Sequence, residues 1–306
     1  MIVFTFPGQG SQRPAMGEPW TATPSWAVVD EVAEATGRDL AALLLRTEAD
    51  ELTATRNAQL ATFAVSLVAL DATRRAGVDA AMVAGHSLGE YTALVAAGVL
   101  SPADGARLVA ARGDAMQAAA DARPGTMAAV LGATAEDVAG ACAATGADVW
   151  LANDNAPGQA VVAGDPAAID AAGDAFREVG AKKVVALPVG GAFHTPFMAP
   201  AAEQLGSALA AASWQPGTIP VVANVDAARH EPGGADWSEL LARQLTSPVR
   251  WREGLVALAA AGATALVEIG PGGVLTGLAK RTVPDLARTS VASPDDLAAA
   301  LAALGS

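Results

Sequence analysis

The sequence is poor in the residues that build disulfides and basic surfaces. It has one cysteine, Cys142, so no disulfide can form within the chain. Cys142 lies in an alanine-rich helical stretch, which favours a small buried side chain over a reactive thiol. Lysine occurs at only three positions, and the formal net charge is -13. Because a phosphate backbone attracts lysine and arginine, this balance argues against a nucleic-acid partner.

The chain also lacks the features of a membrane or exported protein. No apolar run approaches the length that crosses a bilayer, and Met1 to Phe6 enters a strand pattern without the basic start and cleavage site of a signal peptide. We therefore expect a cytoplasmic protein, a monomer, with no membrane contact and with no bound metal or cofactor. At 306 residues and 52% hydrophobic content, the chain can bury one large core, or a core with an inserted subdomain.

Segments with the spacing of strands and of helices alternate along the chain. Ile2 to Phe6 has the pattern of a buried strand, and Pro7-Gly8-Gln9-Gly10 must form a turn after it. The apolar spacing predicts further strands at 81–85, 220–224 and 265–269, and helices at 26–35, 58–76, 88–100, 102–120, 200–212, 238–245, 252–261 and 274–281. Such alternation predicts an α/β fold with a parallel sheet.

Residues 125–189 show a different order of elements. Six segments follow one another as β-α-β-β-α-β, at 127–131, 135–144, 149–152, 160–163, 166–179 and 183–188. This order is the ferredoxin-like split motif. The sequence therefore predicts a large subdomain made of residues 1–124 and 190–306, and an inserted small subdomain made of residues 125–189.

The run Gly85-His86-Ser87-Leu88-Gly89 places a serine between a predicted strand and a predicted helix. Gly-x-Ser-x-Gly in this context predicts a nucleophile elbow, in which a Cβ at either glycine would collide with the neighbouring strand or helix. The helix that follows points its N-terminal amides at the serine, which suits a developing oxyanion. Ser87 is therefore the candidate nucleophile.

A serine hydroxyl needs a general base at neutral pH, and histidine is the usual one. Of the three histidines, His86 is adjacent to Ser87, and neighbouring side chains in such a turn point apart. His230 lies in a segment of loop composition, which favours a solvated surface residue. His194 lies in Gly-Gly-Ala-Phe-His-Thr-Pro, where the predicted insert returns the chain to the large subdomain. This position favours His194 as the base, although a packed loop histidine is the alternative.

Seven motifs, in this order, resemble those of malonyl-CoA:acyl-carrier-protein transacylases. They are Phe6-Pro7-Gly8-Gln9-Gly10-Ser11-Gln12, Gly85-His86-Ser87-Leu88-Gly89-Glu90, Ala111-Arg112-Gly113, the segment 153–159, Ala192-Phe193-His194-Thr195-Pro196, the segment 244–251, and Glu268-Ile269-Gly270-Pro271-Gly272. The similarity runs from residue 2 to about residue 281. It implies an α/β-hydrolase-like core with a ferredoxin-like insert, as the element order predicts independently. A phosphate loop at Gly8-x-Gly10 is discounted, because no Gly-Lys-Ser/Thr follows it.

The resemblance also implies roles for single residues. Ser87 is the acylated nucleophile and His194 its base, and the amides of Gln9 and Leu88 form the oxyanion hole. Arg112 matches the ligand of the substrate carboxylate. A guanidinium can bind a carboxylate through two parallel hydrogen bonds, so it can select malonyl over acetyl. From the residues alone, Arg112 could equally be a surface arginine of a helix.

The resemblance places Gln244 where a carbonyl group orients the histidine, in place of the aspartate of a hydrolase triad. A triad acid could instead come from Asp165, Asp170 or Asp174, but these lie in the predicted insert and are better explained as solvated surface residues. Asn155 either contacts the substrate or shapes the turn between two strands.

Two further positions bear on the acyl group. Relatives selective for methylmalonyl usually have glutamine after the nucleophile and serine before the histidine, whereas this chain has Leu88 and Phe193. A bulky Phe193 should crowd an α-methyl branch. Gly191 replaces the histidine of the common His-Ala-Phe-His motif and is expected to leave extra room.

The predicted activity is transfer of malonyl from malonyl-CoA to the phosphopantetheine thiol of an acyl carrier protein, in fatty acid or polyketide biosynthesis. The alternatives are a serine hydrolase or thioesterase that clears carrier proteins, a trans-acting loader of another extender unit, and a docking module without activity. Carrier proteins are typically acidic, so a basic patch is expected on the enzyme. The candidates are Lys182, Lys183, Arg250, Lys280 and Arg281.

Overall fold

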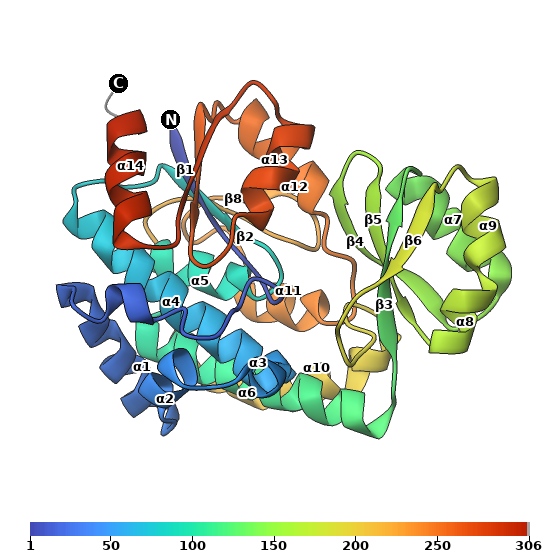
Figure 1. The fold of residues 1–306 in the computed structure, drawn as a ribbon, viewed down its shortest axis with the longest axis horizontal. Coiled ribbons are helices and arrows are strands. Elements are labelled where there is room, and N and C mark those ends of the chain that lie inside the picture. The colour runs from blue at the N-terminus through green and yellow to red at the C-terminus, as the bar shows by residue number, and fades with distance from the viewer. Residues whose placement is uncertain (305–306) are drawn as a thin grey trace.

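The computed structural model describes residues 1–304 and contains two β-sheets (Figure 1). The larger sheet has the strand order β10-β9-β1-β2-β7-β8, and all of its neighbours are parallel except β7 and β8. Its strands are β1 (Ile2–Phe6), β2 (Met82–Gly85), β7 (Val221–Val222), β8 (Arg229–His230), β9 (Ala265–Ile269) and β10 (Ala287–Val291). The α/β class with a parallel sheet, predicted from the alternating pattern, is confirmed.

Helices cover both faces of the larger sheet, so β1 is buried on both sides, as is usual for parallel strands. Phe4 and Phe6 pack into one hydrophobic layer, and Val3 packs into the opposite one with Leu255 and Leu278. The helices of this part are α1 (Ala27–Thr36), α2 (Leu40–Leu45), α3 (Ala49–Thr53), α4 (Thr55–Arg75), α5 (Gly89–Ala96), α6 (Pro102–Ala122), α10 (Ala199–Ala211), α11 (Trp237–Gln244), α12 (Trp251–Ala260), α13 (Val274–Thr282) and α14 (Pro294–Leu304).

Sequence patterning located most of these elements but missed the end of the chain. No element was predicted after Arg281, yet β10 and α14 follow there. The sequence of β10, Ala-Arg-Thr-Ser-Val, lacks an apolar run because this strand lies at the edge of the sheet and is only partly buried. The predicted strand at 220–224 is reduced to the two residues of β7, since Asn224 turns away into polar contacts described below.

The smaller sheet is antiparallel, with the order β4-β5-β3-β6. This is the ferredoxin-like order, and it joins β3 (Thr126–Leu131), β4 (Val149–Ala156), β5 (Gln159–Gly164) and β6 (Lys183–Ala186). One face carries α7 (Ala135–Thr145), α8 (Pro166–Ala171) and α9 (Gly173–Glu178), which lie away from the larger sheet (Figure 1). The single helix predicted at 166–179 is therefore two short helices that meet at Ala172. The division of the chain at residues 125 and 189 stays a prediction.

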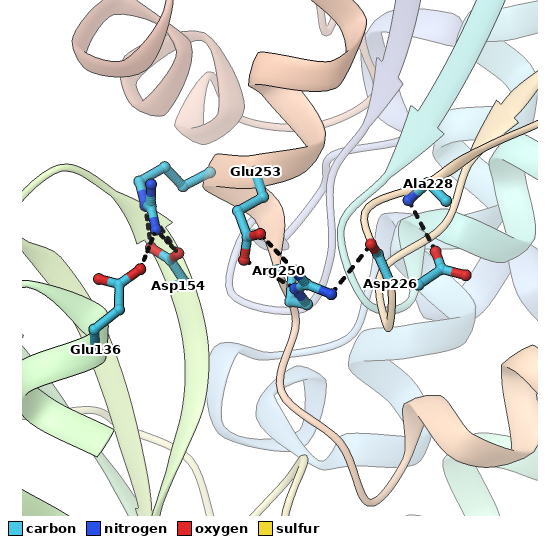
Figure 2. A network of polar contacts seen from close by, with 7 residues as sticks. Glu136, Asp154, Asp226, Ala228, Arg250 and Glu253 are labelled. Atoms are coloured by element: carbon cyan, nitrogen blue, oxygen red, sulfur yellow. Dashed lines mark hydrogen bonds and ion pairs between the residues drawn. The ribbon is translucent and has the colours of Figure 1, made fainter. Parts of the chain in front are cut away.

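Charged groups connect α12 of the larger part with β4 and α7 of the smaller part (Figure 2). The Arg252 guanidinium, on α12, donates through Nε to both carboxylate oxygens of Asp154 on β4, at 3.0 and 2.8 Å, and through Nη2 to Glu136 on α7 at 2.8 Å. The Asp154 amide also donates to the Val249 carbonyl at 2.9 Å. These contacts hold β4 against the segment before α12, so both sheets contribute to one cleft.

Candidate active site

Ser87 lies in a sharp turn between β2 and α5. Its φ is 50°, a left-handed conformation that costs energy for any residue with a Cβ. A Cβ on Gly85 would lie 1.9 Å from the carbonyl carbon of Gly89, and a Cβ on Gly89 would lie 2.0 Å from the carbonyl oxygen of Phe6. Both glycines are required because strand and helix pack this closely. The predicted nucleophile elbow is confirmed, together with its steric reason.

His194 lies within hydrogen-bonding distance of Ser87. The distance from Ser87 Oγ to His194 Nε2 is 2.8 Å, and His194 Nδ1 lies 2.8 Å from the main-chain carbonyl oxygen of Gln244. A carbonyl can only accept, so Nδ1 carries the proton and Nε2 is free to accept from the serine hydroxyl. The carbonyl therefore does the work that an aspartate does in a hydrolase triad. His194 also has a positive φ, 61°, which nothing in the sequence indicated.

The environment of His194 favours its neutral, basic form. Burial lowers the pKa of His194 to about 3, and the positive charge of Arg112 acts in the same direction, while the bond to Gln244 opposes them. A lowered pKa means that Nε2 stays unprotonated as the pH falls, down to about pH 3. The imidazole of His194 is therefore unprotonated over the whole neutral and mildly acidic range.

We expect this to be visible in the pH dependence of Ser87 reactivity. The rate at which a fluorophosphonate labels Ser87 should change by less than about twofold between pH 8 and pH 5, since His194 does not gain a proton there. A histidine of ordinary pKa would be about nine-tenths protonated at pH 5.5. A fall of the labelling rate centred near pH 6.5 would contradict the structure, and Ser87→Ala protein supplies the unlabelled background.

Arg112 projects from α6 to the nucleophile and is only 1% exposed. Its Nη2 donates to Ser87 Oγ at 3.0 Å and to the Gln244 side-chain oxygen at 2.9 Å, and its Nη1 donates to Gln59 Oε1 at 2.7 Å. The Tyr91 ring lies 5.5 Å from the guanidinium carbon. All of these partners are neutral. The reading of Arg112 as a surface residue is therefore wrong.

In the described part of the chain, the buried guanidinium is in direct contact with no acidic side chain, and Glu90 acts on it only from a longer distance. Within residues 1–304, no carboxylate forms an ion pair with Arg112. Its Nε also lacks a hydrogen-bond acceptor. Burial lowers the pKa of Arg112, since the charged form has lost its water. A buried charge of this kind is costly, and an anionic ligand would compensate it.

A cavity of about 530 Å³ opens in front of Ser87 and is lined by both parts of the molecule. Gln9, Arg112, Phe193, His194 and Asn155 all line it, so the structure brings these predicted site residues together. Met127, Ala129 and Val161 of the smaller sheet form the opposite wall. The cleft expected at the return from the insert is present.

The space beside Gly191 is not free. A Cβ on Gly191 would lie 2.6 Å from Cε1 of Phe193, so the phenyl ring already fills the room that the missing histidine leaves. The expectation of extra room was wrong. Phe193 is 5% exposed and forms a wall of the cavity.

Leu88 and Gln9 occupy the positions expected of oxyanion donors. The amides of the two residues that follow Leu88 are used within the turn, with Gly89 donating to His86 at 2.8 Å and Glu90 to Ser87 at 3.2 Å. The Leu88 amide precedes them at the start of α5, where helical N–H groups have no partner within the helix. Gln9 lies in the turn after β1, and the register of β1 with β2 pairs Phe6 with Gly85, so both turns meet at the same sheet edge.

Asn155 is part of β4 and not of the turn between β4 and β5. Its side-chain oxygen accepts from His86 Nε2 at 2.8 Å, and the His86 ring packs edge-on against Trp251 at 5.4 Å. Burial lowers the pKa of His86. His86 is thus turned away from Ser87 Oγ, as predicted, and Asn155 fixes it in the cavity wall.

Sequence reasoning missed three polar residues that hold the site. Gln59, Glu90 and Asn224 are each no more than 3% exposed. Gln59 positions Arg112, and the Asn224 side chain accepts from the Ser87 amide at 2.6 Å. A signal was available for two of them, because Gln59 and Glu90 are polar residues in otherwise apolar helical segments.

The remaining candidates lie elsewhere. Asp165 caps α8, and Asp174 pairs with Arg177, so neither reaches His194. Cys142 is 4% exposed, which confirms the expected small buried side chain, and burial raises the pKa of its thiol to about 11. His230 is not a solvated residue, since it is half-buried between Asp226 and Trp237.

Residues 1–304 contain neither a cluster of metal-ligating side chains nor a helix that could span a membrane. No group of three or more His, Cys, Asp or Glu side chains is placed to hold a metal ion in this part of the chain. Likewise, none of its helices combines the length and the apolar character that a membrane span requires.

Comparison with known proteins agrees with the geometry. The acyl transferase domain family matches residues 3–298. The malonyl CoA-acyl carrier protein transacylase of Escherichia coli K12 is 43% identical over an alignment of 307 positions, which covers 98% of this chain and 98% of that protein. The crystal structure of malonyl-CoA:acyl carrier protein transacylase from Xanthomonas oryzae pv. oryzae has a TM-score of 0.93 at 45% identity, covering 99% of this chain and 98% of that one.

A third comparison concerns a complex. The structure of a type II PKS acyl-carrier protein with its malonyl-transacylase matches at a TM-score of 0.93 and 38% identity, covering 99% of both chains. The resemblance inferred from the seven motifs is confirmed. With its elbow, its Ser-His pair and its buried arginine, the chain belongs to the acyl transferase domain family, among the malonyl-CoA:acyl-carrier-protein transacylases.

Proposed function

We propose that the protein transfers malonyl from malonyl-CoA to the phosphopantetheine thiol of an acyl carrier protein, in fatty acid or polyketide biosynthesis. The observation that carries this proposal is the Arg112 guanidinium, which is buried without an acidic partner 3.0 Å from Ser87 Oγ. In a malonyl ester of Ser87, one methylene separates the carbonyl from the free carboxylate. That short distance suits Arg112, and the names of the relatives agree with this substrate.

The first half-reaction forms the acyl-enzyme. Ser87 Oγ attacks the thioester carbonyl of malonyl-CoA as His194 Nε2 takes the hydroxyl proton. The amides of Gln9 and Leu88 stabilise the oxyanion of the tetrahedral intermediate. The C–S bond then breaks, the proton passes from His194 to the departing sulfur, and coenzyme A leaves as the thiol.

The second half-reaction reverses these roles. The carrier-protein thiol gives its proton to His194 and attacks the malonyl-serine ester. Collapse of the intermediate breaks the bond to Ser87 Oγ, which recovers the proton from His194. No bound cofactor takes part in this scheme. We also propose that the enzyme works as a cytoplasmic monomer.

The cavity suits a small, unbranched acid. Arg112 binds its carboxylate, while Phe193 closes the side where an α-methyl group would project. Gln244, which does not line the cavity, holds Arg112 through its side-chain oxygen. These contacts support malonyl as the acyl group over methylmalonyl.

A serine hydrolase or thioesterase of neutral acyl chains is the principal alternative. Such an enzyme has no use for a guanidinium buried beside its nucleophile, where the charge costs free energy. A docking module without activity is disfavoured by the intact pair of Ser87 and His194. Intact-mass measurement after incubation with malonyl-CoA tests the proposal. A malonyl adduct that moves to a holo carrier protein supports it, whereas rapid release of free malonate without transfer would overturn it.

The proposed carrier-protein surface lies at one end of the smaller sheet. Three neighbouring strands place residues side by side there, on the face of the sheet that lines the cavity. They are Gln159 on β5, Leu131 on β3 and Lys183 on β6. Lys183 is exposed there, as is the neighbouring Lys182. From the other side of the cavity, Arg281 on α13 donates to the side chain of Gln159. Positive groups therefore flank the mouth of the cavity.

Arg250 does not fit this patch. Its guanidinium is taken up by Glu253 and by the main-chain carbonyl of Asp226, as Figure 2 shows. We therefore restrict the proposed docking patch to Lys182, Lys183, Lys280 and Arg281.

Charge reversal in the docking patch should weaken carrier-protein binding alone. For the double variant Lys183→Glu/Arg281→Glu we expect KM for the carrier protein to rise about tenfold at low salt, since rim charges act through long-range attraction. The rate of Ser87 acylation by malonyl-CoA should stay within about twofold. Arg177→Glu on the outer helix α9 is the matched control, and unchanged carrier-protein kinetics in the double variant would refute the patch.

A further inference from the structure

Glu90 is a buried carboxylate that the mechanism above does not use. It lies in the first turn of α5 and is 1% exposed. No lysine or arginine of residues 1–304 forms an ion pair with it. Burial raises the pKa of Glu90 to about 8, while the hydrogen bonds from Asn224 and Gln244 and the charge of Arg112 act to lower it, so Glu90 is a carboxylate above that pH. Burying an acid is costly, so an apolar side chain would serve packing better.

Both carboxylate oxygens of Glu90 accept hydrogen bonds from residues that hold the site. Oε1 accepts from the Asn224 main-chain amide at 2.8 Å, and Oε2 accepts from Nε2 of Gln244. The Asn224 side chain in turn holds both sides of the elbow, because it accepts from the Ser87 amide at 2.6 Å and donates to the Gly85 carbonyl at 2.7 Å. Glu90 is thus the common acceptor beneath the nucleophile.

The amide of Gln244 lies between Glu90 and Arg112, and its orientation is determined by them. Arg112 can only donate, so Oε1 of Gln244 must face it, at 2.9 Å. Glu90 accepts, so the amide nitrogen must face the carboxylate. The second hydrogen of that nitrogen goes to the Ser87 carbonyl oxygen at 2.9 Å. The oxygen and both hydrogens of this amide therefore have partners, and a reversed amide would set two donors against each other at Arg112.

We infer that Glu90 is a positioning residue for acyl selection: its carboxylate orients the Gln244 amide, which in turn fixes the guanidinium of Arg112 for the acyl carboxylate. This inference rests on the proposed function of Arg112. If the inference is correct, loss of the Glu90 carboxylate changes the ratio of malonyl to acetyl transfer. The reactivity of the Ser87-His194 pair should change only a little. The pair keeps the Gln244 main-chain carbonyl whatever the side chain does.

The variant Glu90→Gln tests the inference with little change in volume, in assays at about pH 9, where Glu90 is ionised. An amide at position 90 faces two donors, Asn224 N and Gln244 Nε2, with only one acceptor oxygen. Either one bond is lost or Gln244 turns over and presents its nitrogen to Arg112. We expect KM for malonyl-CoA to rise about tenfold and the ratio of malonyl to acetyl transfer to fall about tenfold, the size of a weakened hydrogen bond to a charged group.

Fluorophosphonate labelling separates a loss of acyl selection from a loss of folded protein. The amount of probe bound gives the concentration of sites with a working Ser87-His194 pair. Each transfer rate is divided by this concentration, so partial unfolding does not alter the ratio of malonyl to acetyl transfer. The labelling rate of Glu90→Gln should remain within about threefold of wild type. Glu90→Asp keeps a charged acceptor and should retain more of the malonyl preference than Glu90→Gln. Glu268→Gln is the matched control, because Glu268 is equally buried but holds the start of α13.

The outcomes are distinguishable. A normal malonyl to acetyl ratio in Glu90→Gln overturns the inference, and so does an equal loss of labelling and malonyl transfer, which would show a general structural role. A smaller malonyl preference in Glu90→Asp than in Glu90→Gln also overturns it. If wild-type protein reacts with the fluorophosphonate but not with malonyl-CoA, the proposed function itself has failed.

Discussion

Ser87→Ala protein is expected to form no malonyl adduct and to lose at least about 10⁴-fold in transfer rate. The expectation follows from the distance of 2.8 Å between Ser87 Oγ and His194 Nε2, since no other hydroxyl is so placed within residues 1–304. Intact mass after incubation with malonyl-CoA measures the adduct, and transfer to holo carrier protein measures the rate. Ser11→Ala is the matched control, because Ser11 lines the same cavity. An undiminished adduct in Ser87→Ala would place the nucleophile elsewhere.

The left-handed backbone conformation at position 87 is also expected to lower the free energy of unfolding. Alanine at 87 keeps a Cβ at a φ of 50°, whereas glycine adopts that conformation without strain. Ser87→Gly protein should therefore be more stable than Ser87→Ala protein by about 1 kcal/mol. Urea denaturation of the two inactive variants measures the difference. Equal stability would mean that the elbow stores no strain.

Arg112→Ala is expected to lower kcat/KM for malonyl-CoA by about 10²–10³-fold, through loss of a buried, charged interaction with the acyl carboxylate. Transfer of acetyl, which has no carboxylate, should fall far less or rise, so the selectivity collapses. Competition between malonyl-CoA and acetyl-CoA in one reaction, read by intact mass, measures it directly. The effect is large because Arg112 alone, among the described residues that line the cavity, carries a fixed positive charge.

Two controls sharpen this experiment. Arg107→Ala removes an exposed arginine from the same helix, where it pairs with Asp104, and should leave selectivity unchanged. Arg112→Lys keeps the charge but loses the planar fork that bonds Gln59 and Gln244 together, so it should recover only part of the malonyl rate. Normal malonyl transfer in Arg112→Ala would show that the carboxylate is bound elsewhere.

The sequence was sufficient for the chemistry that depends on local motifs. Gly85 and Gly89 around Ser87 indicated the elbow, because their spacing reports a steric requirement that only a strand-turn-helix imposes. Elimination among three histidines indicated His194, and the structure places it at hydrogen-bonding distance. The alternation of elements predicted the α/β class, and the order within residues 125–189 predicted the topology of the smaller sheet.

The supporting residues were not predictable in this way. Asn224 reaches Ser87 from a position more than a hundred residues away in the chain, and only the pairing of β7 with β2 brings them together. The space beside Gly191 looked free because sequence shows which side chain is missing, not which neighbour moves in. The strand β10 was not predicted, because an edge strand needs few apolar residues and its sequence shows no strand pattern. The positions of these supporting residues depend on contacts between segments far apart in the chain, which a local sequence pattern does not show.

The order of strands in the larger sheet bears on how the enzyme is made. β1 lies between β2 and β9, and Ile2 pairs with Ala265. During synthesis β1 can join β2 early, but its other edge has no partner until the ribosome has passed residue 269. The turn that contains Gln9 directly follows this strand, so its position depends on a strand that is paired on one edge only. We therefore expect nascent chains arrested before β9 to be inactive and prone to association through the open edge.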